Sequence, residues 1–451
     1  MSESTPAPED NVPTIATVPS DTLAQPRRVV TGGISWRKTF SALRHRNYRL
    51  FFSGQLISLI GTWMQMVAEG WLVYQLSNSA FLLGFVRFLN TLPVTLLSLI
   101  GGAVADRSDK RRILVATQIS AMTLALALSV LVYLHVVKVW HVAALGLLLG
   151  IVNAFDIPTR QSFVVEMVGK EDLMNAIALN SSMFNGARIF GPALAGILIG
   201  VVGLAGCFFF NGLSYIAVII GYLAMQLPAV VAKTDHPPMW EATMEAFRHV
   251  ASNRVTRTII ILVAIVSLFG WPYTVLMPVF ARDVLHVGAK GYGYLMALNG
   301  VGAFAGAMTL ASLGNYPNRR RLVFGGLTGF SIMLFVFAMS RIFWLSGLAL
   351  VCSGWFMLLF FATANTSVQM RTPDELRGRV MGIYSLAFIG LSPIGSLLAG
   401  AIARATSASF AVGLGAVVCA LSALIVHDLV PPQQPPAAAS SAIPSETARA
   451  N

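Results

Sequence analysis

The sequence predicts an all-α membrane protein with twelve transmembrane helices, and three features support this fold class. Hydrophobic residues make up 56% of the 451 residues and charged residues only 11%, whereas charged residues account for about a quarter of a typical soluble protein. Apolar stretches of about 20 residues, the length that spans a bilayer as a helix, recur along the chain. Lys and Arg gather in alternate connections between these stretches.

The first six spans form a predicted N-terminal bundle, 48–226. Each is an apolar stretch that ends at polar or basic residues, such as the turn near Asn78 and the basic run from Arg107 to Arg112. The predicted helices, in chain order, are 48–76, 80–104, 112–133, 139–160, 176–200 and 205–226.

A polar segment, 227–255, is the predicted central cytoplasmic linker, and Trp240 to Arg248 within it has the pattern of an amphipathic helix lying on the membrane surface. The remaining six apolar stretches form a predicted C-terminal bundle, 256–429. The predicted helices of this bundle are 256–282, 289–312, 321–340, 343–366, 380–403 and 408–429.

The ends of the chain and its charges predict the topology. Residues 1–47 are expected to be a disordered cytoplasmic tail with a basic segment before the first helix, and 430–451 a second disordered cytoplasmic tail. With the N-terminus inside, inner segments carry 23 of the 31 Lys and Arg and outer loops carry five. This asymmetry places both termini in the cytoplasm and explains the net charge of +12 without a nucleic-acid partner.

The two halves repeat one plan. Trp63 recurs as Trp271 at an offset of 208 residues, and Asn90 recurs as Asn299 at an offset of 209. Matches at nearly constant spacing predict two pseudo-symmetric bundles with a substrate site between them, as in many transporters.

The stretch GGAVADRSDKRR, residues 101–112, resembles the signature loop of the major facilitator superfamily, G-x-x-x-D-R/K-x-G-R/K-R/K. Gly102 would permit close helix contact, and Asp106 would face the positive N-terminus of a partner helix such as the eleventh. We predict a cytoplasmic gate here; the alternative is that the charges only determine topology. The matching residues are Gly102, Asp106, Arg107, Lys110 and Arg111, with Asp109 in place of the second Gly.

A second stretch, 153–196, is similar to the branch of this superfamily that includes macrolide and enterobactin exporters, often called transmembrane secretion effectors. The resemblance implies the facilitator fold, with helices 1, 4, 7 and 10 around a central cavity. Pro192 and its neighbouring glycines would form a bendable contact with the other half. The residues that carry the resemblance are Phe155, Asp156, Pro158, Arg160, Gln161, Asn180, Arg188, Gly191, Pro192 and Gly196.

An acidic residue, Glu69, lies inside the first span, where a charge is costly and marks a functional site. Gln55, Ser58, Thr62, Gln65 and Glu69 follow one another at intervals of 3, 4, 3 and 4 residues. This spacing places all five on one helix face, and we predict that the face lines the cavity.

Arg87 is the predicted partner of Glu69. Each lies nine residues from Asn78, so both should lie about 13 Å along their helices from the turn, at one depth. Arg87 either keeps Glu69 ionised until substrate or a proton breaks the pair, or the pair is a static link between two helices.

Further polar residues inside the spans are candidates for the site. Arg188 should face the bundle interior and bind an acid or carbonyl groups, and Asp156 is its candidate partner. Asn153 is a candidate cavity residue, together with Asn180, Asn185, Trp271, Tyr273, Asn299, Trp355 and Asn365.

These features predict a proton-coupled exporter of a small molecule, such as a siderophore or drug, that works by alternating access. We expect a monomer in the bacterial cytoplasmic membrane, with its substrate, protons and lipid as partners and no nucleic acid. The alternatives are an uptake carrier or lipid flippase on the same fold, or a membrane sensor that does not transport. No phosphate-binding loop, nucleophile–base pattern or metal-ligand spacing occurs, so we expect no enzyme activity, cofactor or metal.

Overall fold

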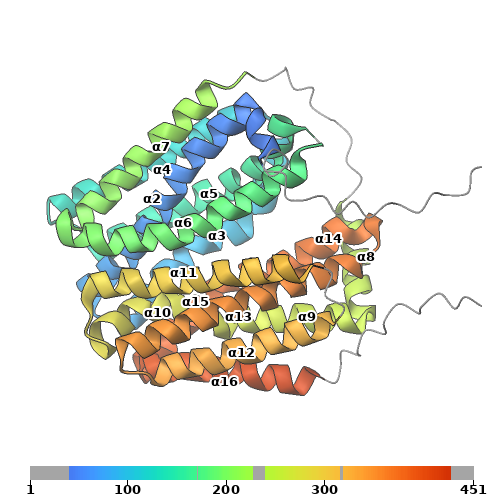
Figure 1. Cartoon of the computed structure of the whole chain (residues 1–451). Coiled ribbons are helices and arrows are strands. Elements are labelled where there is room, and N and C mark those ends of the chain that lie inside the picture. The colour runs from blue at the N-terminus through green and yellow to red at the C-terminus, as the bar shows by residue number, and fades with distance from the viewer. Residues whose placement is uncertain (1–39, 170, 227–238, 315–317, 428–451) are drawn as a thin grey trace, which may run out of the picture. The chain divides into compact units, whose positions relative to one another are not determined.

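A computed structural model of the chain describes residues 40–169, 171–226, 239–314 and 318–427 (Figure 1). Within these ranges, twelve helices are long and apolar enough to cross a membrane, as predicted. Residues 1–39 and 428–451 of the predicted tails, and 227–238 of the predicted linker, lie outside the described residues.

Short polar connections join the helices of the first bundle. Ser79 caps one helix by accepting a hydrogen bond from the backbone N–H of Leu82, and Asp109 caps the next through the N–H of Arg112. The six helices are α2 (Arg46–Ser77), α3 (Ala80–Arg107), α4 (Lys110–Tyr133), α5 (Val139–Val168), α6 (Leu173–Val201) and α7 (Gly203–Leu223).

The last residues of the predicted basic segment are fixed against the start of α6. A 3-10 turn, η1 (Ser41–Arg44), precedes α2. Ser41 Oγ donates a hydrogen bond to Asp172 Oδ1 (2.6 Å), and His45 Nε2 lies 2.8 Å from Asp172 Oδ2. These two hydrogen bonds hold the pKa of Asp172 below its ordinary value, because they favour the carboxylate.

Two spans of the second bundle contain π-helical turns, which occur often at functional sites. The seventh span consists of α9 (Arg254–Ile265), η2 (Val266–Gly270), α10 (Tyr273–Val279) and η3 (Phe280–Val284). Pro272 cannot donate a backbone hydrogen bond, and the wider turn η2 ends just before it. The eleventh span consists of α14 (Asp374–Ser385), η4 (Leu386–Gly390) and α15 (Ser392–Ala405). The other four helices are α11 (Gly288–Leu313), α12 (Arg319–Met339), α13 (Phe343–Met370) and α16 (Ala408–His427).

The predicted linker contains a helix, α8 (Met239–Ser252), where the sequence indicated one. α8 packs against α14, and Glu245 Oε2 lies 3.7 Å from Arg379 Nη1. The linker helix is therefore attached to the start of the eleventh span.

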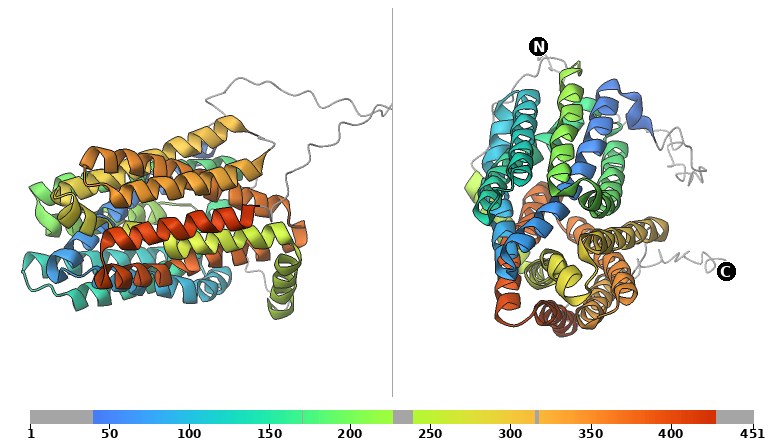
Figure 2. Two further views of the ribbon diagram at one scale, coloured as in Figure 1. Left: turned by 90° about the horizontal axis from the view of Figure 1, so that it is seen from below. Right: turned by 90° about the vertical axis from the view of Figure 1, so that its left-hand side faces the viewer.

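The two bundles are separate groups of helices when viewed along the helix axes (Figure 2). They meet where α6 crosses α11 and where α3 crosses α15. Internal packing repeats between them, because the Asn90 carbonyl lies against Gly150 and the Asn299 carbonyl lies against Gly354. This confirms the predicted pseudo-symmetry.

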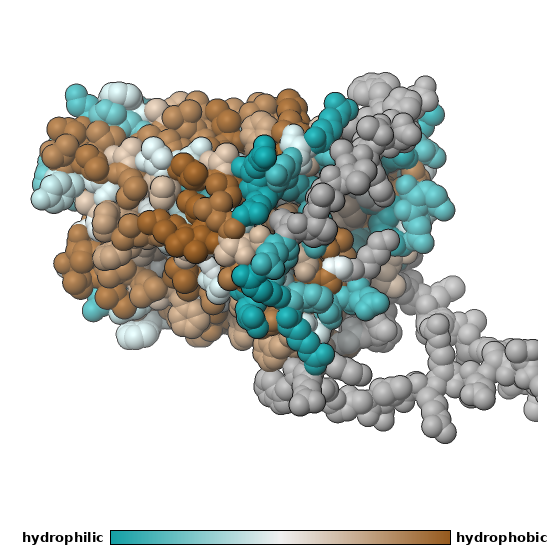
Figure 3. Space-filling view, turned by 90° about the horizontal axis from the view of Figure 1, so that it is seen from above, coloured by the Kyte–Doolittle hydropathy of each residue, from teal (hydrophilic) through white to brown (hydrophobic). Residues whose placement is uncertain are grey.

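The face of the molecule seen in Figure 3 is divided into zones. A broad hydrophobic band is flanked by hydrophilic residues, which are most dense towards one end (Figure 3). We call the end with the α3–α4, α5–α6 and α13–α14 connections the basic end. The end with the α2–α3 and η3–α11 connections is the opposite end.

Candidate functional site

A cavity of about 90 Å³ lies between the bundles. It is large enough for several water molecules or for one polar group of a larger molecule. Its walls come from α2, α3 and α6 of the first bundle and from the α9–α10 span and α11 of the second. The lining residues are Trp63, Met66, Glu69, Gly70, Val73, Leu83, Val86, Arg87, Arg188, Trp271, Thr274, Val275, Tyr292, Met296 and Asn299.

Glu69 and Arg87 both face this cavity, as their equal distance from the α2–α3 turn predicted. Their charges are close enough to interact, but among the described residues they form no ion pair within 4.0 Å. Glu69 Oε1 points towards Gly146 of α5, where an added Cβ would lie 3.7 Å from it. A carboxylate and a guanidinium that interact without direct contact respond to any change in the charge of either group, such as protonation of the carboxylate.

Arg188 binds the second bundle. Its Nη2 donates a hydrogen bond to Asn299 Oδ1 (2.7 Å), and its Cζ lies 5.8 Å from the centre of the Trp271 ring. Asn299 in turn donates to the carbonyl of Leu350 (3.2 Å). This chain of polar contacts links α6, α11 and α13 beside the cavity.

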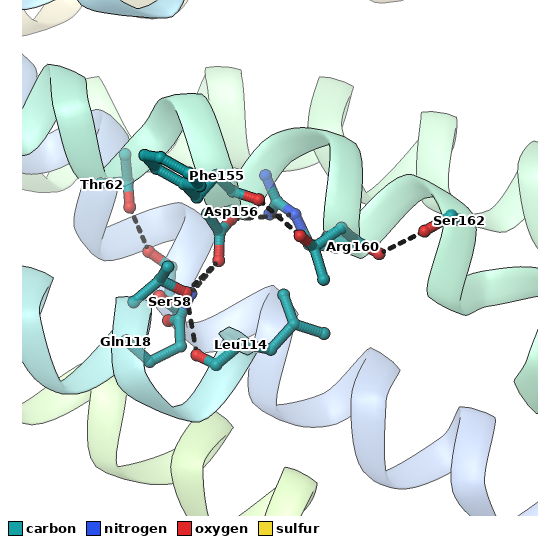
Figure 4. Close-up of polar contacts among 10 residues, drawn as sticks. Ser58, Thr62, Leu114, Gln118, Phe155, Asp156, Arg160 and Ser162 are labelled. Atoms are coloured by element: carbon teal, nitrogen blue, oxygen red, sulfur yellow. Dashed lines mark hydrogen bonds and ion pairs between the residues drawn. The ribbon is translucent and has the colours of Figure 1, made fainter. Parts of the chain in front are cut away.

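The predicted Arg188–Asp156 pair is wrong, because Asp156 is engaged elsewhere. Its carboxylate accepts hydrogen bonds from Thr117 (3.0 Å) and Gln118 (2.8 Å) of α4 and lies 3.4 Å from Nε of Arg160 (Figure 4). All of these groups belong to the first bundle. Asp156 therefore joins α4 to α5 and does not line the cavity described above.

The polar face predicted for the first helix divides between two environments. Glu69 lines the cavity, but Gln65 is buried and accepts a hydrogen bond from Asn211 of α7 (2.6 Å). Thr62 is exposed and donates to the Ser58 carbonyl of its own helix. Successive members of the pattern lie about 40° to 60° apart around the helix, because an α-helix has 3.6 residues per turn, and they also differ in depth, so they meet different neighbours.

Asn153 of α5 also lies outside the cavity wall. The family resemblance implied that helices 1, 4, 7 and 10 enclose the cavity. The first and seventh do line it, but the other lining residues belong to the second, fifth and eighth helices. Helices 4 and 10 contribute no lining residue to this cavity.

The predicted gate is not engaged at the basic end. Asp106 and Arg107 are exposed, and Asp106 makes no hydrogen bond or ion pair with any other described residue. Lys110 Nζ binds Glu166 Oε1 of α5 (2.5 Å), and Arg111 donates to the Leu223 carbonyl of α7. Lys110 and Arg111 of the signature loop thus bind within their own bundle.

The close helix contact belongs to Gly101, and its assignment to Gly102 was wrong. A Cβ on Gly101 would lie 3.0 Å from the carbonyl carbon of Ala154, whereas one on Gly102 would meet nothing nearer than Pro158 at 3.9 Å. The rotation of α3 about its axis, which the motif does not reveal, decides which glycine faces α5.

The bundles are joined at the opposite end by residues that the sequence analysis missed. Tyr74 of α2 donates a hydrogen bond to Asp283 of η3, and Arg282 donates to Asn78. The Arg282 guanidinium also lies 5.3 Å from the centre of the Tyr74 ring. Trp71, three residues before Tyr74 in α2, stacks on Tyr292 of α11 with ring centres 6.3 Å apart. Their signal in the sequence is weak, because aromatic and charged residues are common where helices leave the membrane.

Within the described residues, no group of three or more His, Cys, Asp or Glu is arranged to hold a metal. The lining groups can instead exchange a proton, bind an anion and stack on a ring, because they are a carboxylate, two guanidiniums and three aromatic side chains.

Comparison with known proteins agrees with this architecture. A family profile described as "Transmembrane secretion effector" matches residues 37–449. The staphyloferrin A transporter of Staphylococcus aureus is 25% identical over 355 residues, which cover 78% of this chain and 88% of the relative. The multidrug efflux pump Tap of Mycolicibacterium fortuitum is 28% identical, with coverage of 80% and 89%. The enterobactin exporter EntS of Citrobacter koseri is 23% identical, with coverage of 89% and 97%.

Solved structures share the fold at low sequence identity. A POT family transporter in complex with a thioalcohol conjugated peptide superposes with a TM-score of 0.69 at 10% identity, covering 84% of this chain and 95% of that one. A bacterial homologue of the lysosomal transporter Spinster, described as inward-facing and unoccupied, superposes with a TM-score of 0.61 at 15% identity, covering 88% and 96%. The chain therefore belongs to the transmembrane secretion effector family of the major facilitator superfamily, as a multi-pass transporter of a bacterial inner membrane.

Proposed function

We propose that this chain exports a small molecule in exchange for protons, by alternating access to the cavity between its bundles. The observation that carries the proposal is the position of Glu69. Its carboxylate lines the cavity near Arg87 without a direct ion pair, so a proton or a substrate group can change the interaction between them.

The contacts at the two ends support an alternating-access cycle. Tyr74, Asn78, Arg282 and Asp283 join the bundles at the opposite end, while Asp106 at the basic end has no partner among the described residues. The excess of Lys and Arg at the basic end supports a cytoplasmic location for that end, by the positive-inside rule. This arrangement corresponds to a state in which the outer side is closed.

Glu69 is the proposed coupling residue. A proton that reaches Glu69 from the outer side neutralises it and weakens its hold on Arg87, which allows the bundles to rearrange once the substrate has left. Loss of that proton to the cytoplasm restores the charge and prepares the site for the next substrate. The names of the relatives suggest siderophores and drugs as substrates to test first.

The test uses inside-out vesicles that carry the protein and an imposed proton gradient. Staphyloferrin A, enterobactin and a macrolide are added in turn, and proton release from the vesicle lumen is followed with a pH-sensitive dye. We expect release with one compound class for the natural protein and for the control Glu171→Gln, whose carboxylate is exposed outside the spans. We expect no release for Glu69→Gln.

Other results would select a different function. Proton release that survives Glu69→Gln would remove Glu69 from the coupling role. Accumulation of a compound in right-side-out vesicles, without release in inside-out ones, would indicate an uptake carrier. A protein that binds these compounds but moves neither them nor protons would be a sensor.

A further inference from the structure

The cavity carries an excess of positive charge. Its ionisable lining residues are Glu69, Arg87, Arg188 and the ordinarily neutral Tyr292. With Glu69 ionised these side chains sum to one positive charge, and with Glu69 protonated they sum to two. The net charge of the cavity is therefore positive in either protonation state of Glu69.

Arg188 is the source of this excess, because its partners are neutral. Asn299 Oδ1 accepts one of its hydrogen bonds at 2.7 Å, and the Trp271 ring lies 5.8 Å away. No carboxylate among the described residues lies within 4.0 Å of it. Asp156, the other acid in the middle of a described span, is held by Thr117, Gln118 and Arg160.

An arginine buried among membrane helices requires a compensating partner. The Arg188 guanidinium has five N–H donors, and Asn299 accepts a hydrogen bond from one of them. A guanidinium can bind carboxylate or phosphate oxygens through two parallel hydrogen bonds. Because Arg188 lines an open cavity, the missing negative charge can come from a bound molecule.

The remaining walls accept an apolar or aromatic body. Aromatic rings and thioether groups contribute large, polarisable surfaces next to the guanidinium. These side chains are Trp63, Trp271, Tyr292, Met66 and Met296.

We propose that the transported molecule is an organic anion with an aromatic or apolar body, and that its anionic oxygen group binds Arg188 beside Asn299 and Trp271. This inference rests on the proposed transport function and names its substrate class. Cationic molecules are disfavoured, because they would meet two guanidiniums in the cavity.

The test measures binding by isothermal titration calorimetry, with the full-length protein in nanodiscs of neutral lipid at neutral pH. The three probes share one ring system: 2-naphthoate is an anion, 2-naphthamide is neutral and 2-naphthylmethylammonium is a cation. We expect 2-naphthoate to bind at least about tenfold more tightly than the amide, because a charge-assisted hydrogen bond is stronger than a neutral one. The ammonium should bind most weakly.

Two variants separate anion binding from a structural role of Arg188. Arg188→Gln should abolish the preference for the anion. Asn299→Asp places a carboxylate next to Arg188 and should also abolish it, while the thermal midpoint shows whether the protein stays folded. The matched control is Arg112→Gln, whose side chain is 88% exposed, and it should keep the preference.

The proposal fails if the amide or the ammonium binds as tightly as 2-naphthoate, if none of the three binds at millimolar concentration, or if folded Asn299→Asp retains the preference. The titration with 2-naphthoate is repeated in nanodiscs that contain an anionic phospholipid. Weaker binding of 2-naphthoate there would show that the lipid headgroup competes for the site and is a source of the anion. The assay uses no proton gradient. Proton exchange with a neutral or cationic compound would therefore refute the substrate class alone, and anion binding without proton exchange would refute the transport proposal alone.

Discussion

Gly293 of α11 lies directly on Gly196 of α6, because a Cβ on Gly293 would come within 2.7 Å of the Gly196 Cα. The equivalent crossing of α3 and α15 places Gly84 and Gly400 together, with the Gly84 Cα 3.2 Å from an added Cβ on Gly400. The two bundles thus approach each other at a pair of glycine contacts related by the pseudo-symmetry. Small residues let helix backbones meet closely in membranes.

Gly293→Ala should therefore damage the protein, although alanine is the better helix former. The added methyl would overlap the backbone of α6, and overpacking of this kind costs about 1–3 kcal/mol. We expect a lower thermal midpoint and reduced transport.

Gly200→Ala is the control for this substitution. An added Cβ there meets no atom within 4 Å, so the helix should gain up to about 1 kcal/mol in propensity. Equal midpoints for the two variants would show that the α6–α11 contact is looser than described.

A double-mutant cycle on Glu69 and Arg87 distinguishes proton coupling from a static link. Glu69→Gln leaves the Arg87 guanidinium without a nearby carboxylate, and Arg87→Gln leaves the Glu69 carboxylate without a nearby guanidinium. Each single variant should therefore be less stable than the natural protein. The double variant should recover part of the loss, with a coupling free energy of about 0.5–3 kcal/mol.

Transport by the double variant then decides between the two roles. If the pair couples protons, the double variant stays folded but exchanges no protons in the vesicle assay. If the pair is only a link between α2 and α3, proton exchange returns together with stability. Additive losses would show that the two charges do not interact.

Tyr74→Phe should loosen the opposite end of the transporter. It removes the hydrogen bond to Asp283 but keeps the ring that lies against Arg282. A hydrogen bond to a charged group contributes about 1.5–3 kcal/mol, so the open population should rise about tenfold or more.

Spin labels on Gln75→Cys and His286→Cys, two exposed positions at this end, would report the change as longer distances in pulsed electron paramagnetic resonance. Tyr133→Phe, at a tyrosine that is exposed and far from this contact in the sequence, should leave the distances unchanged. Identical distributions for Tyr74→Phe would mean that this hydrogen bond does not hold the end closed.

Stability should depend on Asp172 in acid. Hydrogen bonds from Ser41 and His45 lower the pKa of Asp172, so the folded state binds a proton less readily than the unfolded state. The resulting stabilisation is complete above the unfolded-state pKa of about 4. It disappears as pH falls from there through the lower pKa of the folded state.

Detergent-solubilised protein unfolded at a series of pH values would measure this effect. Asp172→Asn should show a smaller loss of stability over the acid range than the natural protein, and the neighbouring exposed Glu171→Gln should behave like the natural protein. The same acid response in all three would exclude Asp172 as a contributor.

Sequence patterns were sufficient for the twelve spans, the linker helix α8 and the common depth of Glu69 and Arg87. These features depend on interactions within one helix or one hairpin, where length and a rise of 1.5 Å per residue fix positions. The repeat of Trp63 as Trp271 likewise predicted two related bundles with a site between them, and both tryptophans line the cavity.

The contacts made by the other site residues depend on packing between helices that are distant in the sequence. The rotation of each helix about its axis decides which side chains meet. It gives Arg188 the partner Asn299 and not Asp156, and it gives Gln65 the partner Asn211. It also turns Gly101, and not Gly102, towards α5. Neighbouring helices and their crossing angles set that rotation, and residues within a single span do not encode it. The contacts of Tyr74 and Asn78 with Arg282 and Asp283 join segments more than 200 residues apart, so they exist only once both bundles have packed together.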